Sequence, residues 1–93
     1  MSAYVIVNGT VKDAEKMQQY GAAAGPTLAQ HGGELVCRGP IEVLSGSSDY
    51  QIAVIIRFPD GAAARSWYES PAYQAIIPTR EAALDSVFVL LSD

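Results

Sequence analysis

The sequence predicts an α+β fold with the element order βαββαβ, in which one four-stranded antiparallel sheet carries both helices on one face. Three observations lead to this prediction. The chain has 93 residues, enough for a single modest core, so we expect one domain over residues 1–93. Four short apolar stretches typical of strands are separated by two helical stretches in that order. Two of these strands are apolar on both faces, which indicates a sheet that is covered on both sides.

The first strand and first helix occupy the first third of the chain. Residues 3–11, AYVIVNGTV, are rich in β-branched side chains and predict a strand. Asp13 is expected to cap the helix that follows. One helical face is indicated by residues that recur at spacings of three and four, at Ala14, Met17, Gly21, Ala24, Leu28 and His31. Gly25-Pro26 is expected to kink or divide this helix, because proline removes a backbone donor, and Gly32-Gly33 is expected to end it.

The middle of the chain predicts a pair of strands. Residues 34–44, ELVCRGPIEVL, predict a strand broken at Gly39-Pro40. Residues 50–58, YQIAVIIRF, predict the next strand. The short polar loop SGSSD between them favours an antiparallel hairpin.

The last third predicts a segmented helical region and a final strand. Pro59-Asp60 should open a helix that runs through Glu69. Ser70-Pro71 and Pro78 each predict the restart of a helical piece, because proline is tolerated in a first turn. Ser70 is interpreted as a helix cap, since no nearby histidine and acid would activate it as a nucleophile. Residues 86–92, SVFVLLS, predict the last strand.

Both faces of the predicted sheet are apolar. In one strand Ile52, Val54, Ile56 and Phe58 alternate with Ala53 and Ile55, and in the last strand Val87, Val89 and Leu91 alternate with Phe88 and Leu90. Two helices cover one face, which leaves about 400 Å² of the other. A patch of that size matches the largest that monomers tolerate. We therefore predict a homodimer in which two sheets pack face to face as a closed α/β barrel.

Composition and charge bear on partners and location. The formal net charge is -4, and the six basic residues are scattered, so we expect neither nucleic-acid nor membrane binding. No apolar run exceeds five residues, far below the ~20 that span a bilayer. The start of the chain lacks the pattern of a signal peptide, and the lone Cys37 cannot form an internal disulfide, so a cytoplasmic location is predicted. Cys37 is interpreted as an inert core thiol, and neither a metal site nor a cofactor is predicted.

Two stretches carry a family resemblance. HGGELVCRGPIEVLSG and FPDGAAARSWYESPAYQAIIPTREAA resemble the domain of unknown function 1330 family, within the dimeric α/β barrel superfamily, and the similarity runs from Tyr4 to Leu91. The most specific matches are Trp67, Tyr68, Ser70, Tyr73 and Arg80, and moderately specific ones are Gly32-Gly33, Arg38-Gly39 and Glu42. The resemblance implies the ferredoxin-like fold and the dimer. The family has no settled activity, and the wider superfamily includes cofactor-independent monooxygenases, lactone isomerases, polyketide cyclases and haem-handling enzymes.

The chain also departs from the family pattern. Ser45 and Arg57 stand where the family usually has acidic residues, Met17 replaces an aromatic residue, and Pro40 stands where glycine is common. If the missing carboxylates help to form a polar pocket in the family, the charge of that pocket is altered here.

Charged and titratable side chains supply the candidate chemistry. His31 is the candidate general base, because its ordinary pKa lies near neutrality, and the alternative is a role at the helix C-terminus. Arg38 either pairs with Glu42 or presents its guanidinium to a substrate carboxylate. Arg80 has the same two roles open to it, with Glu81 and Asp85 nearby in sequence.

Aromatic and amide side chains complete the set of candidate ligand-binding residues. Trp67, Tyr68 and Tyr73 can serve both packing and ligand recognition. Tyr4 and Asn8 lie on the same face of the first strand and would add polar groups to an apolar cavity, if that face lines one. Such a cavity suits a small aromatic or polyketide-like molecule.

The expected function is therefore that of a homodimer that binds a small organic molecule between helix and sheet. One hypothesis is a cofactor-independent isomerase or cyclase that transfers a proton through His31, with Arg38 or Arg80 orienting an anionic group. The alternatives are a cofactor-free monooxygenase and a structural or ligand-sensing dimer without chemistry.

Overall fold

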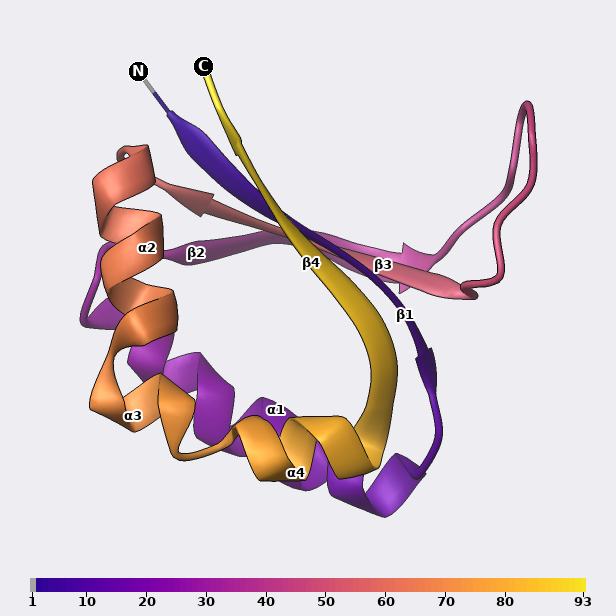
Figure 1. Cartoon of the computed structure of the whole chain (residues 1–93), viewed down its shortest axis with the longest axis horizontal. Helices are drawn as coiled ribbons and strands as arrows, with labels where there is room; N and C mark the ends of the chain where they lie inside the picture. The colour runs from indigo at the N-terminus through magenta and orange to yellow at the C-terminus, as the bar shows by residue number, and fades with distance from the viewer. Residues whose placement is uncertain (1) are drawn as a thin grey trace.

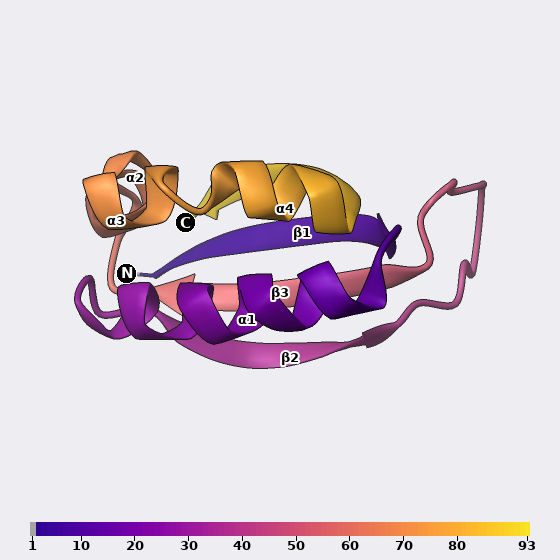
Figure 2. The ribbon, with the colours of Figure 1, turned by 90° about the horizontal axis from the view of Figure 1, so that it is seen from below.

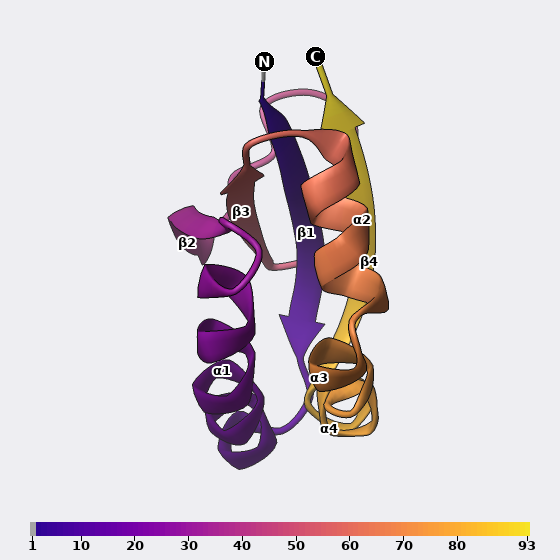
Figure 3. The same ribbon diagram turned by 90° about the vertical axis from the view of Figure 1, so that its left-hand side faces the viewer.

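The computed structural model describes residues 2–93 and has the ferredoxin-like fold (Figure 1). The elements are β1 (Ala3–Val11), α1 (Ala14–Ala29), β2 (Glu34–Pro40), β3 (Ile52–Phe58), α2 (Gly61–Glu69), α3 (Pro71–Gln74), α4 (Ile77–Ala83) and β4 (Leu84–Ser92). All three strand pairings are antiparallel, in the order β2-β3-β1-β4. The helices lie together over one face of the sheet (Figures 2 and 3), as predicted. Among the described residues, no helix is long and apolar enough to cross a membrane.

Helix α1 begins and ends as predicted but is not broken in between. Asp13 caps it, because the Asp13 carboxylate accepts a 3.0 Å hydrogen bond from the backbone N–H of Lys16. Gly32 ends it with φ at +72°, in the left-handed region that favours glycine. Of the kink or division expected at Gly25-Pro26, the division is wrong, since one helix continues to Ala29. The residue before a proline normally avoids helical geometry because its Cβ meets the proline ring, and Gly25 has no Cβ.

The β2–β3 connection is longer than the sequence suggested. Strand β2 ends at Pro40 rather than at residue 44, and β3 begins at Ile52 rather than at residue 50. Residues 41–51 form an extended arm that projects from the sheet (Figure 1), and Leu44 on this arm is 91% exposed. The apolar side chains of residues 41–44 are typical of a strand, but the pairing of β2 with β3 ends at Pro40 and Ile52.

The open sheet face, which turns away from the helices, is largely apolar as predicted. It carries Tyr4, Ile6 and Asn8 from β1, Ala53 and Ile55 from β3, and Val87, Val89 and Leu91 from β4. Val87, Val89 and Leu91 are 44%, 47% and 55% exposed. Cys37 pairs opposite Ile55 and is exposed, so its interpretation as a core thiol is wrong. A bulge between Leu35 and Cys37 shifts the register of β2, which the alternation of the sequence did not reveal.

The core lies between the sheet and the helices, and aromatic rings dominate it. Trp67, Tyr73 and Phe58 are its largest fully buried side chains. The Trp67 ring centroid lies 4.3 Å from that of Tyr73 and 5.4 Å from that of Phe58. The predicted restart at Ser70-Pro71 is confirmed, because the Ser70 hydroxyl accepts a hydrogen bond of 3.2 Å from the Tyr73 N–H. This turn directs Trp67 and Tyr73 into the same core. Pro78 likewise lies in the first turn of α4, as predicted.

Candidate functional site

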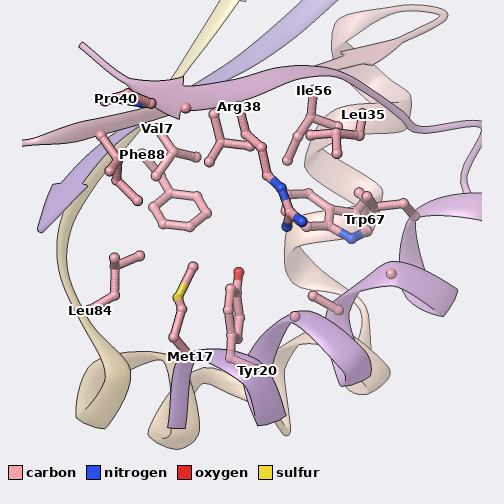
Figure 4. A pocket seen from close by; sticks show the side chains of 17 residues that line it. Val7, Met17, Tyr20, Leu35, Arg38, Pro40, Ile56, Trp67, Leu84 and Phe88 are labelled. Atoms are coloured by element: carbon pink, nitrogen blue, oxygen red, sulfur yellow. The ribbon is translucent and has the colours of Figure 1, made fainter. Parts of the chain in front are cut away.

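A cavity of about 470 Å³ lies between α1 and the helix-covered face of the sheet (Figure 4). Its wall is mostly apolar and includes Met17, Leu28, Val54, Trp67, Leu84 and Phe88. The Tyr20 hydroxyl reaches it from α1 and the Arg38 side chain reaches it from β2 (Figure 4). An apolar cavity of a few hundred Å³ with few polar groups is typical of small-molecule sites.

A chain of hydrogen bonds connects the Tyr20 hydroxyl to a buried cation. The Tyr20 and Tyr73 hydroxyl oxygens are 2.8 Å apart. Arg80, 7% exposed, donates from Nη1 to the Tyr73 hydroxyl at 3.1 Å and to the Tyr68 hydroxyl at 3.0 Å. Its Nη2 donates to the Glu81 carboxylate at 2.9 Å. The guanidinium also lies over the Phe88 ring, with Cζ 4.6 Å from the ring centroid.

Burial and hydrogen bonds together set the protonation of this chain. Burial is the main cause that raises the pKa of Tyr20, and it also raises the pKa of Tyr73. Burial alone would lower the pKa of Arg80, but its hydrogen bonds to Glu81, Tyr68 and Tyr73 outweigh that effect and the net pKa is raised. The hydrogen bond from Arg80 lowers the pKa of Glu81. At neutral pH Tyr20 and Tyr73 are therefore neutral phenols, beside the Arg80 guanidinium and the Glu81 carboxylate.

A second chain of hydrogen bonds runs along the end of α1. The Trp67 indole N–H donates to the Thr27 hydroxyl at 2.9 Å, and this hydroxyl donates to the Ala24 carbonyl at 2.6 Å. His31 Nδ1 lies 3.2 Å from the Thr27 carbonyl oxygen. His31 is half-buried at the helix C-terminus and is not among the residues that line the cavity. Its contacts are those of the helix-terminal alternative that the sequence left open.

The structure brings together some of the predicted site residues and separates others. Arg38 and Trp67 line the cavity, whereas Tyr68, Tyr73 and Arg80 meet one another behind its wall. Arg80 takes Glu81 as its charge partner, one of the two that the sequence offered.

Tyr4, Asn8 and Glu42 lie elsewhere. Tyr4 and Asn8 are on the open sheet face, on the opposite side of the sheet from the cavity. Glu42 is exposed on the arm, and within residues 2–93 it makes no ion pair with Arg38. Arg57, which stands where the family usually has an acid, pairs with Glu34 at 3.2 Å.

Tyr20 and Thr27 are the site residues that the sequence interpretation missed. The predicted buried face of α1 included Gly21, which is exposed in the structure. The buried residues are Tyr20 and Thr27. Tyr20 follows Met17 by three and precedes Ala24 by four, so the same periodicity contained the signal. Tyr20 and Thr27 are polar, so a helical periodicity of mainly small and apolar residues does not include them.

The chain matches a known family over nearly its whole length. A family model described as a domain of unknown function, DUF1330, matches residues 2–93. The chain belongs to this family. No curated protein matches the DUF1330 chain.

Solved structures share the fold of the DUF1330 chain. A protein of unknown function from Rhodopseudomonas palustris is 24% identical with a TM-score of 0.81, and the match covers 99% of this chain and 82% of that one. SnoaB, a cofactor-independent oxygenase from Streptomyces nogalater, is 17% identical with a TM-score of 0.72, and the match covers 99% and 92% of the two chains. A dimeric ferredoxin-like protein of unknown function from Thermobifida fusca is 18% identical with a TM-score of 0.67, and coverage is 100% and 92%. These likenesses show a shared fold.

Proposed function

We propose that this DUF1330 chain binds a small aromatic or polyketide-like molecule in the cavity between α1 and the sheet. The observation that carries the proposal is an apolar cavity of about 470 Å³ into which the Tyr20 and Arg38 side chains point (Figure 4). Phe88, which is half-buried in the wall, offers a ring surface to a flat ligand, and the hydroxyl and guanidinium would orient it.

Arg38 takes the orienting role in this proposal, rather than Arg80. Arg38 is exposed and reaches the cavity from the edge strand β2, so its planar donor group is free to bind an oxygen of the ligand. Arg80 already donates to Tyr68, Tyr73 and Glu81. Withdrawing Arg80 for a ligand would break these hydrogen bonds in a buried place.

Binding is tested with 1-naphthol and a blocked cavity. The titration follows the NMR signal of the indole N–H of Trp67, the one tryptophan of the chain, which lies in the cavity wall. Ala24→Phe fills the cavity from α1 and should weaken binding at least about tenfold, since the ring displaces the ligand. Ala23→Phe, an exposed position on the same helix, is the matched control and should bind as the wild type does. No saturable shift in the wild type, or equal binding by both variants, would reject the proposal.

We also propose that the chain is a homodimer through the open sheet face. Two proteins of the same fold, from Thermobifida fusca and Jannaschia, are described as dimeric. Val87, Val89 and Leu91 are exposed side by side on this face, and a second copy would bury them with Ile6 and Ile55. Light scattering at micromolar concentration should give twice the chain mass of 9.9 kDa. Val89→Asp should give monomers while Leu44→Asp on the arm should not, and a monomeric wild type would overturn the assembly.

A cofactor-independent oxygenase is the second candidate function. The likeness to SnoaB, described as such an enzyme, supports it together with the apolar cavity beside Trp67. The test is oxygen consumption with 1-naphthol or 1,5-dihydroxynaphthalene, corrected for the rate without protein. Turnover that Ala24→Phe abolishes would support this function. Binding of the naphthol without oxygen uptake would contradict the oxygenase function and favour a ligand-sensing dimer.

Proton transfer by His31, as in an isomerase or cyclase, is the candidate with less support from the geometry. Its Nδ1 faces the Thr27 carbonyl, and its ring does not line the cavity. A general base must reach the proton that it removes.

A further inference from the structure

We propose that Tyr20 is a hydrogen-bond donor of fixed direction, and that the ligand of the cavity presents a carbonyl oxygen to it. This inference rests on the proposed binding function and adds the chemical class of the ligand. The inference depends on which atom donates and which accepts in each hydrogen bond of the Arg80–Tyr73–Tyr20 chain.

The direction of the chain is set at Arg80. A guanidinium has five N–H donors and no acceptor, so Arg80 can only donate to the Tyr73 hydroxyl, 3.1 Å away. The Tyr73 oxygen is thereby an acceptor, and its own hydrogen still needs a partner. The Tyr20 oxygen, 2.8 Å away, is that partner.

The opposite arrangement leaves a buried hydrogen unpaired. Tyr73 is 0% exposed, and among the described residues its hydroxyl forms hydrogen bonds only with Arg80 and Tyr20. If Tyr20 donated to Tyr73, the Tyr73 hydrogen would have no acceptor, which buried polar groups avoid. Tyr73 therefore donates to Tyr20, and the cation behind Tyr73 polarises the chain in the same direction.

The Tyr20 hydrogen is then free to point into the cavity, where the hydroxyl lies in the wall (Figure 4). A ligand group that accepts a hydrogen bond completes the chain. Because burial raises the pKa of Tyr20, the hydroxyl keeps its proton at neutral pH and acts as a donor rather than a base. Arg38 lies across the cavity and provides further donors, so both polar groups of the site favour an oxygen that accepts hydrogen bonds and has no hydrogen of its own to place.

A pair of isosteric probes tests the inference. 2-Acetylnaphthalene carries a carbonyl where 2-isopropenylnaphthalene carries a CH₂ group of the same shape, so the ratio of their dissociation constants isolates the hydrogen bond. The wild type should prefer the ketone about fivefold, as expected for one hydrogen bond. Tyr20→Phe should remove the preference, so that the ketone and the alkene bind with equal affinity.

Three further variants identify the donor and its support. Met17→Leu alters the wall without removing a donor and should keep the preference. Tyr73→Phe should reduce it, because Tyr20 then loses the donor that directs its hydrogen; if that variant does not fold, Tyr20→Phe decides alone. Arg38→Met should leave a preference that still depends on Tyr20.

The outcomes separate this inference from the function on which it rests. If neither probe shifts the Trp67 indole signal of the wild type, the binding function fails. If both probes bind equally, the cavity binds apolar molecules but Tyr20 is not a directed donor, and the inference is overturned. A preference that survives Tyr20→Phe and disappears in Arg38→Met would overturn it as well and assign the donor to Arg38.

Discussion

Thr27→Val removes one oxygen from the core while keeping the shape of the side chain. Thr27 is 6% exposed and Trp67 is 1% exposed, and the Thr27 hydroxyl is the acceptor for the Trp67 indole N–H at 2.9 Å. The substitution leaves that N–H buried without a partner, which costs about 1–3 kcal/mol. The substitution also removes the hydrogen bond from the Thr27 hydroxyl to the Ala24 carbonyl. This second loss changes the free energy of unfolding little, because such bonds within a helix are weak. We expect the free energy of unfolding to fall by about 1–2 kcal/mol.

Urea unfolding followed by the fluorescence of Trp67 measures this loss. Wild type and variant are compared at equal protein concentration, because the proposed dimer would make the measured stability depend on concentration. Thr79→Val is the matched control: Thr79 is a half-buried threonine of α4, outside the hydrogen bonds described above, so its substitution should change stability by much less. The midpoint of thermal unfolding should fall by about 4–8 °C for each kcal/mol lost. Equal stability of Thr27→Val and wild type would refute the assignment of this hydrogen bond.

Three further predictions follow from single contacts. His31→Ala should cost up to about 1 kcal/mol of stability, as for a residue at a helix C-terminus, and should leave 1-naphthol affinity unchanged; weakened binding would place His31 in the site after all. Gly33→Ala should destabilise by about 1–3 kcal/mol in urea unfolding, because its Cβ would lie 2.7 Å from the Phe58 ring, whereas Gly21→Ala, with nothing within 4 Å, should not destabilise. Above about pH 10 the unfolded chain releases tyrosine protons that folded Tyr20 and Tyr73 retain, so the free energy of unfolding should fall as the pH rises. Tyr20→Phe should make this fall less steep. An equal dependence of stability on pH in wild type and Tyr20→Phe would contradict the raised pKa.

The strands and most helix ends could be predicted because their causes are local. Alternation along β1, β3 and β4 assigns each side chain to one face, whatever the partner strand is. The helix-terminal roles of Asp13, Gly32 and Ser70 depend only on residues a few positions away, so the sequence alone predicts them.

The errors arose where a local pattern depended on a distant partner. Residues 41–44 are apolar enough for a strand, but β2 ends at Pro40 and they lie on the arm instead. Cys37 was expected in the core because thiols are usually buried, but the bulge in β2 places it on the open sheet face. The expectation at Pro26 failed for a local reason instead: Pro26 was expected to kink or divide α1, but the helix is not divided, because Gly25 has no Cβ to meet the proline ring.

By itself the sequence determined the element order, the two apolar faces of the sheet and the family, since these depend on periodicity and on residues close together in the chain. The tertiary structure alone decided the site. Tyr20 meets Tyr73 across 53 positions, and Trp67 meets Thr27 across 40. Neither pair has a spacing that predicts contact, because what joins them is the tertiary packing that sets α1 beside the segment from α2 to α4. That packing places the Tyr20 hydroxyl in the wall of a cavity, whereas His31, the apparent candidate for catalysis, stays at the end of a helix.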